Sequence, residues 1–217
     1  MKRLILFAAA LLCVSAASAQ GEYNFRKRSL FDVLPIRAND IVFLGNSITD
    51  GCEWAELFNN RHIKNRGISG DRADWMLERI DPLIAGRPKK LFLMIGTNDL
   101  SAGRTPEQIA GDIAKIVARF RDGSPRTKIY VQSILPVNGQ LTDEKRRDFY
   151  ERKNGMIVET NRLIEQVCGE MQVPYVDLYS AMVDGEGRLD KRYSGDGLHL
   201  RGAGYLVWKS VVAPYVK

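Results

Sequence analysis

Residues 40–49 set the architecture of this chain, and they read Asp40-Ile41-Val42-Phe43-Leu44-Gly45-Asn46-Ser47-Ile48-Thr49. Four consecutive apolar residues between an acid and a glycine are typical of a short parallel strand that is buried on both faces. The Gly-Asn-Ser sequence that follows favours a turn and the start of a helix. The stretch therefore predicts a buried strand that ends in a polar turn.

Similar apolar runs recur along the chain, and segments with helical patterns lie between them. The expected strands besides the first are Ile63–Asn65, Leu91–Ile95, Lys128–Val131 and Tyr175–Asp177. The expected helices are 71–80, 105–120, 149–167 and 202–215. Strands that alternate with helices imply right-handed crossovers and a parallel sheet. The expected fold is therefore α/β, a three-layer α/β/α sandwich.

The helix at 105–120 has the clearest start signal. Thr105-Pro106-Glu107-Gln108 combines an N-cap residue, a proline at the first helical position and a glutamine three residues after the cap. Apolar residues then recur at helical spacing from Ile109 to Phe120.

The first 19 residues have the pattern of a signal peptide. Lys2 and Arg3 precede an apolar run over residues 4–14, and the small residues Ala17-Ser18-Ala19 follow. This pattern predicts cleavage before Gln20 and export to the periplasm or the extracellular space, with no membrane-spanning segment in the mature chain. A membrane anchor is the alternative, although the apolar run is short for a span.

The domain organisation and the charge pattern follow from the length and composition of the chain. Residues 20–38 are expected to form an irregular polar arm, and 39–217 a single domain. The 217 residues include 45% hydrophobic side chains, which argues against a disordered chain. The net charge of +6 is not gathered into a stripe, because basic and acidic residues alternate, as over 143–148. That pattern is typical of a solvated helix face, so we expect no nucleic-acid partner.

Small polar clusters follow the first three expected strands. They are Gly45–Thr49, Gly67–Asp71 and Gly96–Asp99. Each cluster alone could be an ordinary turn. The carboxyl ends of parallel strands form one edge of the sheet, however, so all three clusters should converge there.

Two histidines occur in the chain, and they have different surroundings. His62 lies in a polar stretch and is expected to be a solvated surface residue. His199 follows Asp196 by three residues, which places a carboxylate beside an imidazole. An imidazole can take the proton of a serine hydroxyl, and a carboxylate can fix its tautomer. A plain loop turn with a capping residue is the alternative for this pair.

Four of these segments resemble the sequence blocks of the SGNH, or GDSL-like, hydrolases. They are Gly45–Thr49, Ile68–Asp71, Gly96–Asp99 and Asp196–His199, in the order and at the spacing of that family. Residues 65–71 and 198–205 are most similar to the branch of the platelet-activating-factor acetylhydrolase catalytic subunits. The resemblance implies a flavodoxin-like, doubly wound, five-stranded parallel sheet over residues 39–217.

The resemblance also implies a role for each matching residue. Ser47 would be the nucleophile, His199 the general base and then acid, and Asp196 the orienting carboxylate. The backbone N–H groups of Ser47 and Gly70 would form the oxyanion hole with the Asn98 side chain. Neither a metal nor an organic cofactor is implied.

One position departs from the family pattern. Asn46 stands where the first block usually has an aspartate, and it keeps the hydrogen-bonding shape without the charge. We expect this substitution to affect local tuning more than catalysis, because the base is assigned to His199.

The expected function is that of an exported serine esterase acting on a small ester or an acylated glycan, with acetyl the favoured acyl group. A lipase, lysophospholipase or thioesterase is the alternative enzyme. A glycan-binding descendant without catalytic activity is the alternative from another class. The sequence leaves the oligomeric state open.

Four further residues and one segment carry expectations of their own. Cys52 and Cys168 are expected at opposite edges of the sheet, so no disulfide between them is predicted. Trp54 and Trp75 are expected to be buried in the core, with a place in the pocket as the alternative. Residues 134–147 are a candidate for a loop that shapes the pocket.

Overall fold

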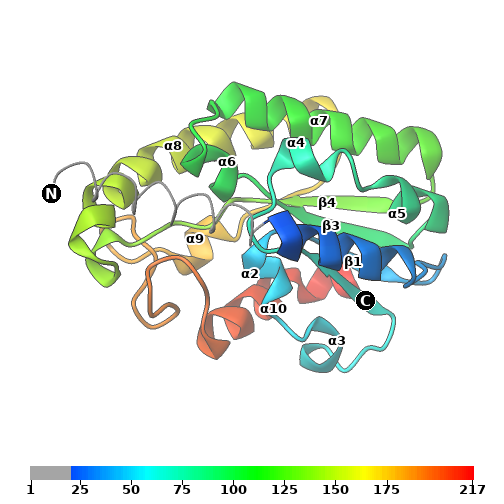
Figure 1. The fold of residues 1–217 in the computed structure, drawn as a ribbon, viewed down its shortest axis with the longest axis horizontal. Helices are drawn as coiled ribbons and strands as arrows, with labels where there is room; N and C mark the ends of the chain where they lie inside the picture. Colours follow the sequence, from blue (N-terminus) through cyan, green and yellow to red (C-terminus); the bar gives the residue numbers. More distant parts are fainter. Residues whose placement is uncertain (1–20) are drawn as a thin grey trace, which may run out of the picture.

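The computed structural model describes residues 21–217, which form a five-stranded, all-parallel sheet between two layers of helices (Figure 1). The expected three-layer α/β/α sandwich is confirmed, and the strand order is β2-β1-β3-β4-β5. The strands are β1 (Ile41–Gly45), β2 (Ile63–Gly67), β3 (Lys90–Met94), β4 (Lys128–Gln132) and β5 (Tyr175–Val176). The expected signal peptide, 1–19, and its cleavage point lie outside the described residues.

Helices cover both faces of the sheet, and each face has its own apolar core. Besides a helical segment over 21–32, the helices are α2 (Ser47–Asp50), α3 (Trp54–Leu57), α4 (Ala73–Met76), α5 (Asp81–Gly86), α6 (Thr97–Ser101), α7 (Pro106–Gly123), α8 (Glu144–Glu170), α9 (Tyr179–Met182) and α10 (Gly202–Val216). Helices α7 and α8 lie over one face, and α3 and α10 lie over the other (Figure 1). No helix within residues 21–217 is both long and apolar enough to cross a bilayer.

Helix α7 begins as its sequence predicts. The Thr105 side chain accepts a hydrogen bond from the Gln108 backbone N–H at 3.3 Å, and the Gln108 side chain accepts one from the Thr105 N–H at 3.0 Å. Two backbone donors that a helix start leaves unpaired are thereby satisfied. Helix α8 is longer than predicted because Asp143 caps it six residues before Phe149. Its charged first turns, 143–148, are exposed as expected.

The prediction of one helix over 71–80 is wrong. Helix α4 covers only Ala73–Met76, and it begins no earlier because the Arg72 backbone before it is extended. After Met76 the chain tightens, so that the N–H groups of Glu78 and Arg79 bond three residues back instead of four. Arg79 is thereby turned inward to reach Asp71.

The expectation of an irregular arm over 20–38 is also wrong for most of that segment, because residues 21–32 are helical. Tyr23, Lys27 and Phe31 recur every four residues and form the face that packs on the domain. Tyr23 and Lys27 both contact the Asp50 carboxylate, and the Arg66 guanidinium lies 4.7 Å from the centre of the Phe31 ring. A helical face made largely of polar residues gave too weak an apolar pattern to be predicted.

The cysteines and tryptophans lie in distinct places. Cys52 and Cys168 are free, buried thiols that belong to the cores on opposite faces of the sheet. Trp54 is buried as predicted and stacks on Phe43 with 4.3 Å between the ring centres. The expectation that Trp75 is buried is wrong, because the residue is 36% exposed, with the Arg72 guanidinium over its ring.

Candidate active site

Ser47 begins the one-turn helix α2, which a single residue separates from the end of β1, the strand that lies between β2 and β3 in the sheet. Asn46 caps this helix, because its side-chain oxygen accepts a hydrogen bond from the Ile48 backbone N–H at 3.0 Å. Asparagine and aspartate are equally good N-caps, so Asn46 preserves the local geometry that an aspartate would give. The cap holds the Ser47 side chain at the carboxyl edge of the sheet.

The structure brings the three predicted triad residues together. The Ser47 hydroxyl oxygen lies 3.1 Å from His199 Nε2, and His199 Nδ1 lies 2.7 Å from the Asp196 carboxylate. Ser47 is 152 residues away from His199 in the sequence, whereas Asp196 and His199 lie on one loop. This is the order of contacts that proton transfer from a serine through an imidazole requires.

Asp196 is held ionised by hydrogen bonds. Partial burial of this carboxyl group works against ionisation, but the His199 ring and the backbone N–H groups of Leu198 and His199 outweigh it and lower the pKa of Asp196 to about 2. A carboxylate with such a pKa is negatively charged at every pH at which an enzyme of this kind would work. It can therefore stabilise a positive charge on His199.

The residues expected to form the oxyanion hole come from the strands on either side of β1. Gly70 follows β2, and its φ of +78° lies in the left-handed region that favours glycine. Asn98 follows β3, and its side-chain nitrogen donates a hydrogen bond to the Asp71 carbonyl oxygen at 3.0 Å. That bond fixes the amide beside the Gly70 turn, and an amide nitrogen has a second N–H available for a ligand.

Two buried carboxylates beneath this edge support the expected oxyanion residues, and their roles were not foreseen from the sequence. Asp71 accepts two hydrogen bonds from the buried Arg79 guanidinium, at 2.8 and 2.5 Å. Asp99 accepts bonds from the Ala73 N–H at 3.0 Å and from Arg104 at 2.8 Å. The loop after β2 is thus tied to the helix after β3. Asp71 and Asp99 stood within recognised motifs, but the sequence did not reveal their distant partners.

The loop that carries Asp196 and His199 rests on the segment after β4. Gly197 has a φ of +80°, and a side chain there would collide with the Asn138 carbonyl oxygen. The Asn138 N–H donates to the Gly197 carbonyl oxygen at 2.9 Å, and Ser194 donates to the His199 carbonyl oxygen at 2.8 Å. Within the segment 134–147, the first part is buried and supports this loop, and α8 begins at Glu144. A role for the segment in shaping the pocket stays a prediction.

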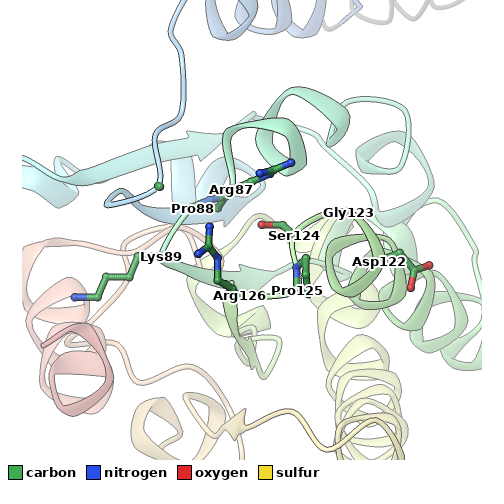
Figure 2. Close-up of a pocket in the computed structure, with 9 residues that line it drawn as sticks. Arg87, Pro88, Lys89, Asp122, Gly123, Ser124, Pro125 and Arg126 are labelled. Carbon is green, nitrogen blue, oxygen red and sulfur yellow. The ribbon is translucent and has the colours of Figure 1, made fainter.

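Two hollows on the described part of the chain lie away from the triad. One, of about 600 Å³, is lined by residues that precede β3 and β4, at the amino edge of the sheet, and Figure 2 shows Arg87 and Lys89 pointing away from each other across it. The other, of about 420 Å³, includes His62, whose imidazole lies 3.6 Å from Asp40. His62 is therefore remote from the residues that contact Ser47.

The triad itself is open to solvent: 48% of the His199 side chain and 56% of the Asp196 side chain are exposed. The serine, the imidazole and the carboxylate are hydrogen-bonded in sequence at the carboxyl edge of a parallel sheet, which is an arrangement that serine hydrolases use. The family match places the chain among the carboxylic ester hydrolases. The chain belongs to the GDSL-like Lipase/Acylhydrolase family, whose sequence model matches residues 43–207.

Comparisons with individual proteins agree with this assignment. The human platelet-activating factor acetylhydrolase IB subunit alpha1 is 31% identical over 172 residues, which cover 76% of this chain and 70% of that protein. A solved structure from Streptococcus pneumoniae has a TM-score of 0.83 at 32% identity and covers 97% of this chain and 99% of its own. An acetylxylan esterase from Geobacillus stearothermophilus shares the fold, with a TM-score of 0.64 at 18% identity, covering 83% of this chain and 95% of its own.

Proposed function

We propose that this chain is an exported serine esterase that removes short acyl groups, acetyl above all, from carbohydrate or other small ester substrates. The observation that carries the proposal is the continuous hydrogen-bonded path from Ser47 through His199 to Asp196. The family relationship supports ester hydrolysis, and the proposal adds the roles of the residues, the acyl group and the location.

The geometry supports hydrolysis in two steps. His199 Nε2 takes the proton of Ser47 as the hydroxyl oxygen bonds to the ester carbonyl carbon, and Asp196 stabilises the resulting imidazolium. The carbonyl π electrons move to the oxygen, which the N–H groups of Ser47, Gly70 and Asn98 bind. The C–O bond to the alcohol breaks as His199 returns the proton to the leaving oxygen. Water, activated by His199, then releases the acid from Ser47 in the same manner.

Two observations support acetyl esters of carbohydrates. The similar proteins include one named for acetylhydrolase activity and one named as an acetylxylan esterase. In addition, the exposed His199 and Asp196 side chains leave room above the nucleophile for a bulky alcohol half of the ester. A polymeric sugar could approach such an open edge without entering a deep cavity.

The proposed export rests on the sequence pattern of residues 1–19. Expression of the full chain in a bacterial host, followed by fractionation and N-terminal sequencing, tests it. We expect a protein in the exported fraction that begins at Gln20. A chain that keeps Lys2 and Arg3 and stays with the cells would contradict export and leave the esterase proposal standing.

An ester panel tests the activity. We expect p-nitrophenyl acetate and acetylated xylo-oligosaccharides to be cleaved faster than esters of octanoate or longer acids, and Ser47→Ala to lose at least about 10³-fold in kcat/KM. Ser210→Ala on the exposed face of α10 is the matched control and should keep full activity. Faster cleavage of long-chain esters or thioesters would favour the lipase or thioesterase alternative. Full activity in Ser47→Ala would refute the serine mechanism, and no turnover of any ester would favour the binding descendant.

A further inference from the structure

Lys153 is a buried cation that the catalytic steps above do not use. It lies on α8, only 1% of the residue is exposed, and among residues 21–217 no carboxylate pairs with it. Its ammonium donates a hydrogen bond to the Ser101 hydroxyl at 2.9 Å. Burying an unpaired ammonium is costly, so the position calls for a reason beyond packing.

The Ser101 contact leads to the expected oxyanion hole. Ser101 is the last residue of α6, and its hydroxyl donates to the Thr97 carbonyl oxygen at 3.1 Å, which closes the single turn of that helix. Asn98 is the second residue of the same turn. The Lys153 ammonium therefore holds the C-terminal end of the element whose first turn presents the Asn98 amide.

The other neighbours of Lys153 are two aromatic rings on α8. The Phe149 and Tyr150 rings lie with their centres 5.7 Å from the Lys153 ammonium. Burial raises the pKa of the Tyr150 phenol, and the nearby Asp196 carboxylate adds to that rise. Lys153 thus contacts the Tyr150 ring on its own helix and the Ser101 hydroxyl on the helix that carries Asn98.

We propose that Lys153 is a positioning residue for the reaction, which holds Asn98 in place through Ser101 so that the amide meets the developing oxyanion. The inference rests on the proposed function of this site. An N–H donor must lie close to the position of the oxyanion, and a displacement of about 1 Å can cost on the order of 100-fold in rate. A charged donor makes a stronger hydrogen bond than a neutral amine, so the ammonium form should hold α6 better.

The first test replaces Lys153 with methionine, which has similar length and no charge. We expect kcat for p-nitrophenyl acetate to fall about 10- to 100-fold while KM changes less than about twofold. The melting temperature should stay the same or rise, because a buried unpaired charge is removed. Lys145→Met, an exposed lysine on the same helix, is the control and should match the wild type. An unchanged kcat in Lys153→Met would overturn the proposal.

A double-mutant cycle tests whether Lys153 acts through Asn98. Asn98→Ala alone should lower kcat about 10²- to 10³-fold. If Lys153 acts by placing that amide, then adding Lys153→Met to Asn98→Ala should cause little further loss. Multiplying losses would show that Lys153 acts elsewhere. A wild type that cleaves no ester, or an active Ser47→Ala, would instead refute the proposed function, so the two failures are distinguishable.

The pH profile gives a third readout. Burial lowers the pKa of Lys153 to about 8. The groups that contact its ammonium are the Ser101 hydroxyl on α6 and the Phe149 and Tyr150 rings on α8, of which only the Tyr150 phenol is titratable. We expect wild-type kcat to decline as the pH rises through about 8, and Lys153→Met to lack that decline. An identical alkaline decline in both proteins would contradict a role for the ammonium.

Discussion

Asn46 shows how one side chain can depart from a family pattern and keep its structural role. Its oxygen caps α2 as an aspartate oxygen would, and the residue is buried next to Ser47. The sequence alone could identify the departure, and the structure supplies the reason that it is tolerated. What differs is charge: an aspartate would place a negative group beside the nucleophile and at the N-terminal end of a helix turn.

Two substitutions at this residue separate the cap from the charge. Asn46→Asp should keep the cap, so its free energy of unfolding should stay within about 0.5 kcal/mol of the wild type. Asn46→Ala removes the cap and should cost about 1 kcal/mol, with a lower kcat because Ser47 is held less firmly. Urea unfolding and ester kinetics measure both. An Asn46→Ala protein with wild-type stability would contradict the capping role.

Other residues illustrate what a sequence can and cannot reveal. Ser47, Gly70, Asn98, Asp196 and His199 were predictable because each lies in a short motif at the end of a strand or on a loop. The approach of Ser47, Gly70 and Asn98 to one another followed from the topology of a parallel sheet, whereas the place of Asp196 and His199 beside them followed from the resemblance to the family.

The roles of Arg79 and Lys153 were not predictable in this way. Each is a common basic residue in a helical pattern, and its burial depends on which distant groups the fold places beside it. Nothing in the local sequence distinguishes Lys153 from the exposed Lys145 on the same helix.

At the scale of elements, the short helices at the carboxyl edge differ most from expectation. The strands and the long helices were predictable from apolar runs and from capping residues. Helix α4 was not, because the Asp71–Arg79 ion pair pulls the chain inward and prevents a regular helix over 71–80. Tertiary contacts outweigh helix propensity there.

Removing the Arg79 guanidinium tests how much the Asp71–Arg79 ion pair contributes to the free energy of unfolding. Arg79→Leu leaves the buried Asp71 carboxylate without its partner and should lower the free energy of unfolding by about 3–5 kcal/mol. Arg79 also donates to the Gly45 and Arg66 carbonyl oxygens, so activity should fall as well. Denaturant unfolding checks the prediction, with the exposed Arg87→Leu as control. A loss below about 1 kcal/mol would show that the pair is dispensable.

At the scale of the whole molecule, the sheet separates two apolar cores that each contain one cysteine. Burial raises the pKa of both thiols, Cys52 and Cys168, to about 12, so neither is a ready nucleophile in the folded protein. The reactivity of each thiol therefore measures how readily the apolar core on its own face of the sheet unfolds and exposes it.

Thiol labelling can show whether the two sides open together. If the domain unfolds as one unit, a disulfide reagent should modify Cys52 and Cys168 with opening free energies that agree within about 1 kcal/mol. Mass spectrometry of the labelled peptides at increasing urea concentrations measures both rates, and a reduced sample should show the same intact mass as an untreated one. Much faster labelling of Cys52 would mean that the side with α3 and α10 opens by itself.

The contacts of His199 differ in how far they reach along the chain. Its partner Asp196 belongs to the same loop, whereas Ser47 lies 152 residues away, on the helix turn that follows β1. A small movement of the Ser47 turn relative to the loop of Asp196 and His199 would separate the nucleophile from His199 and leave the Asp196–His199 hydrogen bond intact. We therefore expect moderate heating to abolish ester hydrolysis at a temperature below the melting temperature of the fold. Cooling should restore the Ser47–His199 contact and the activity.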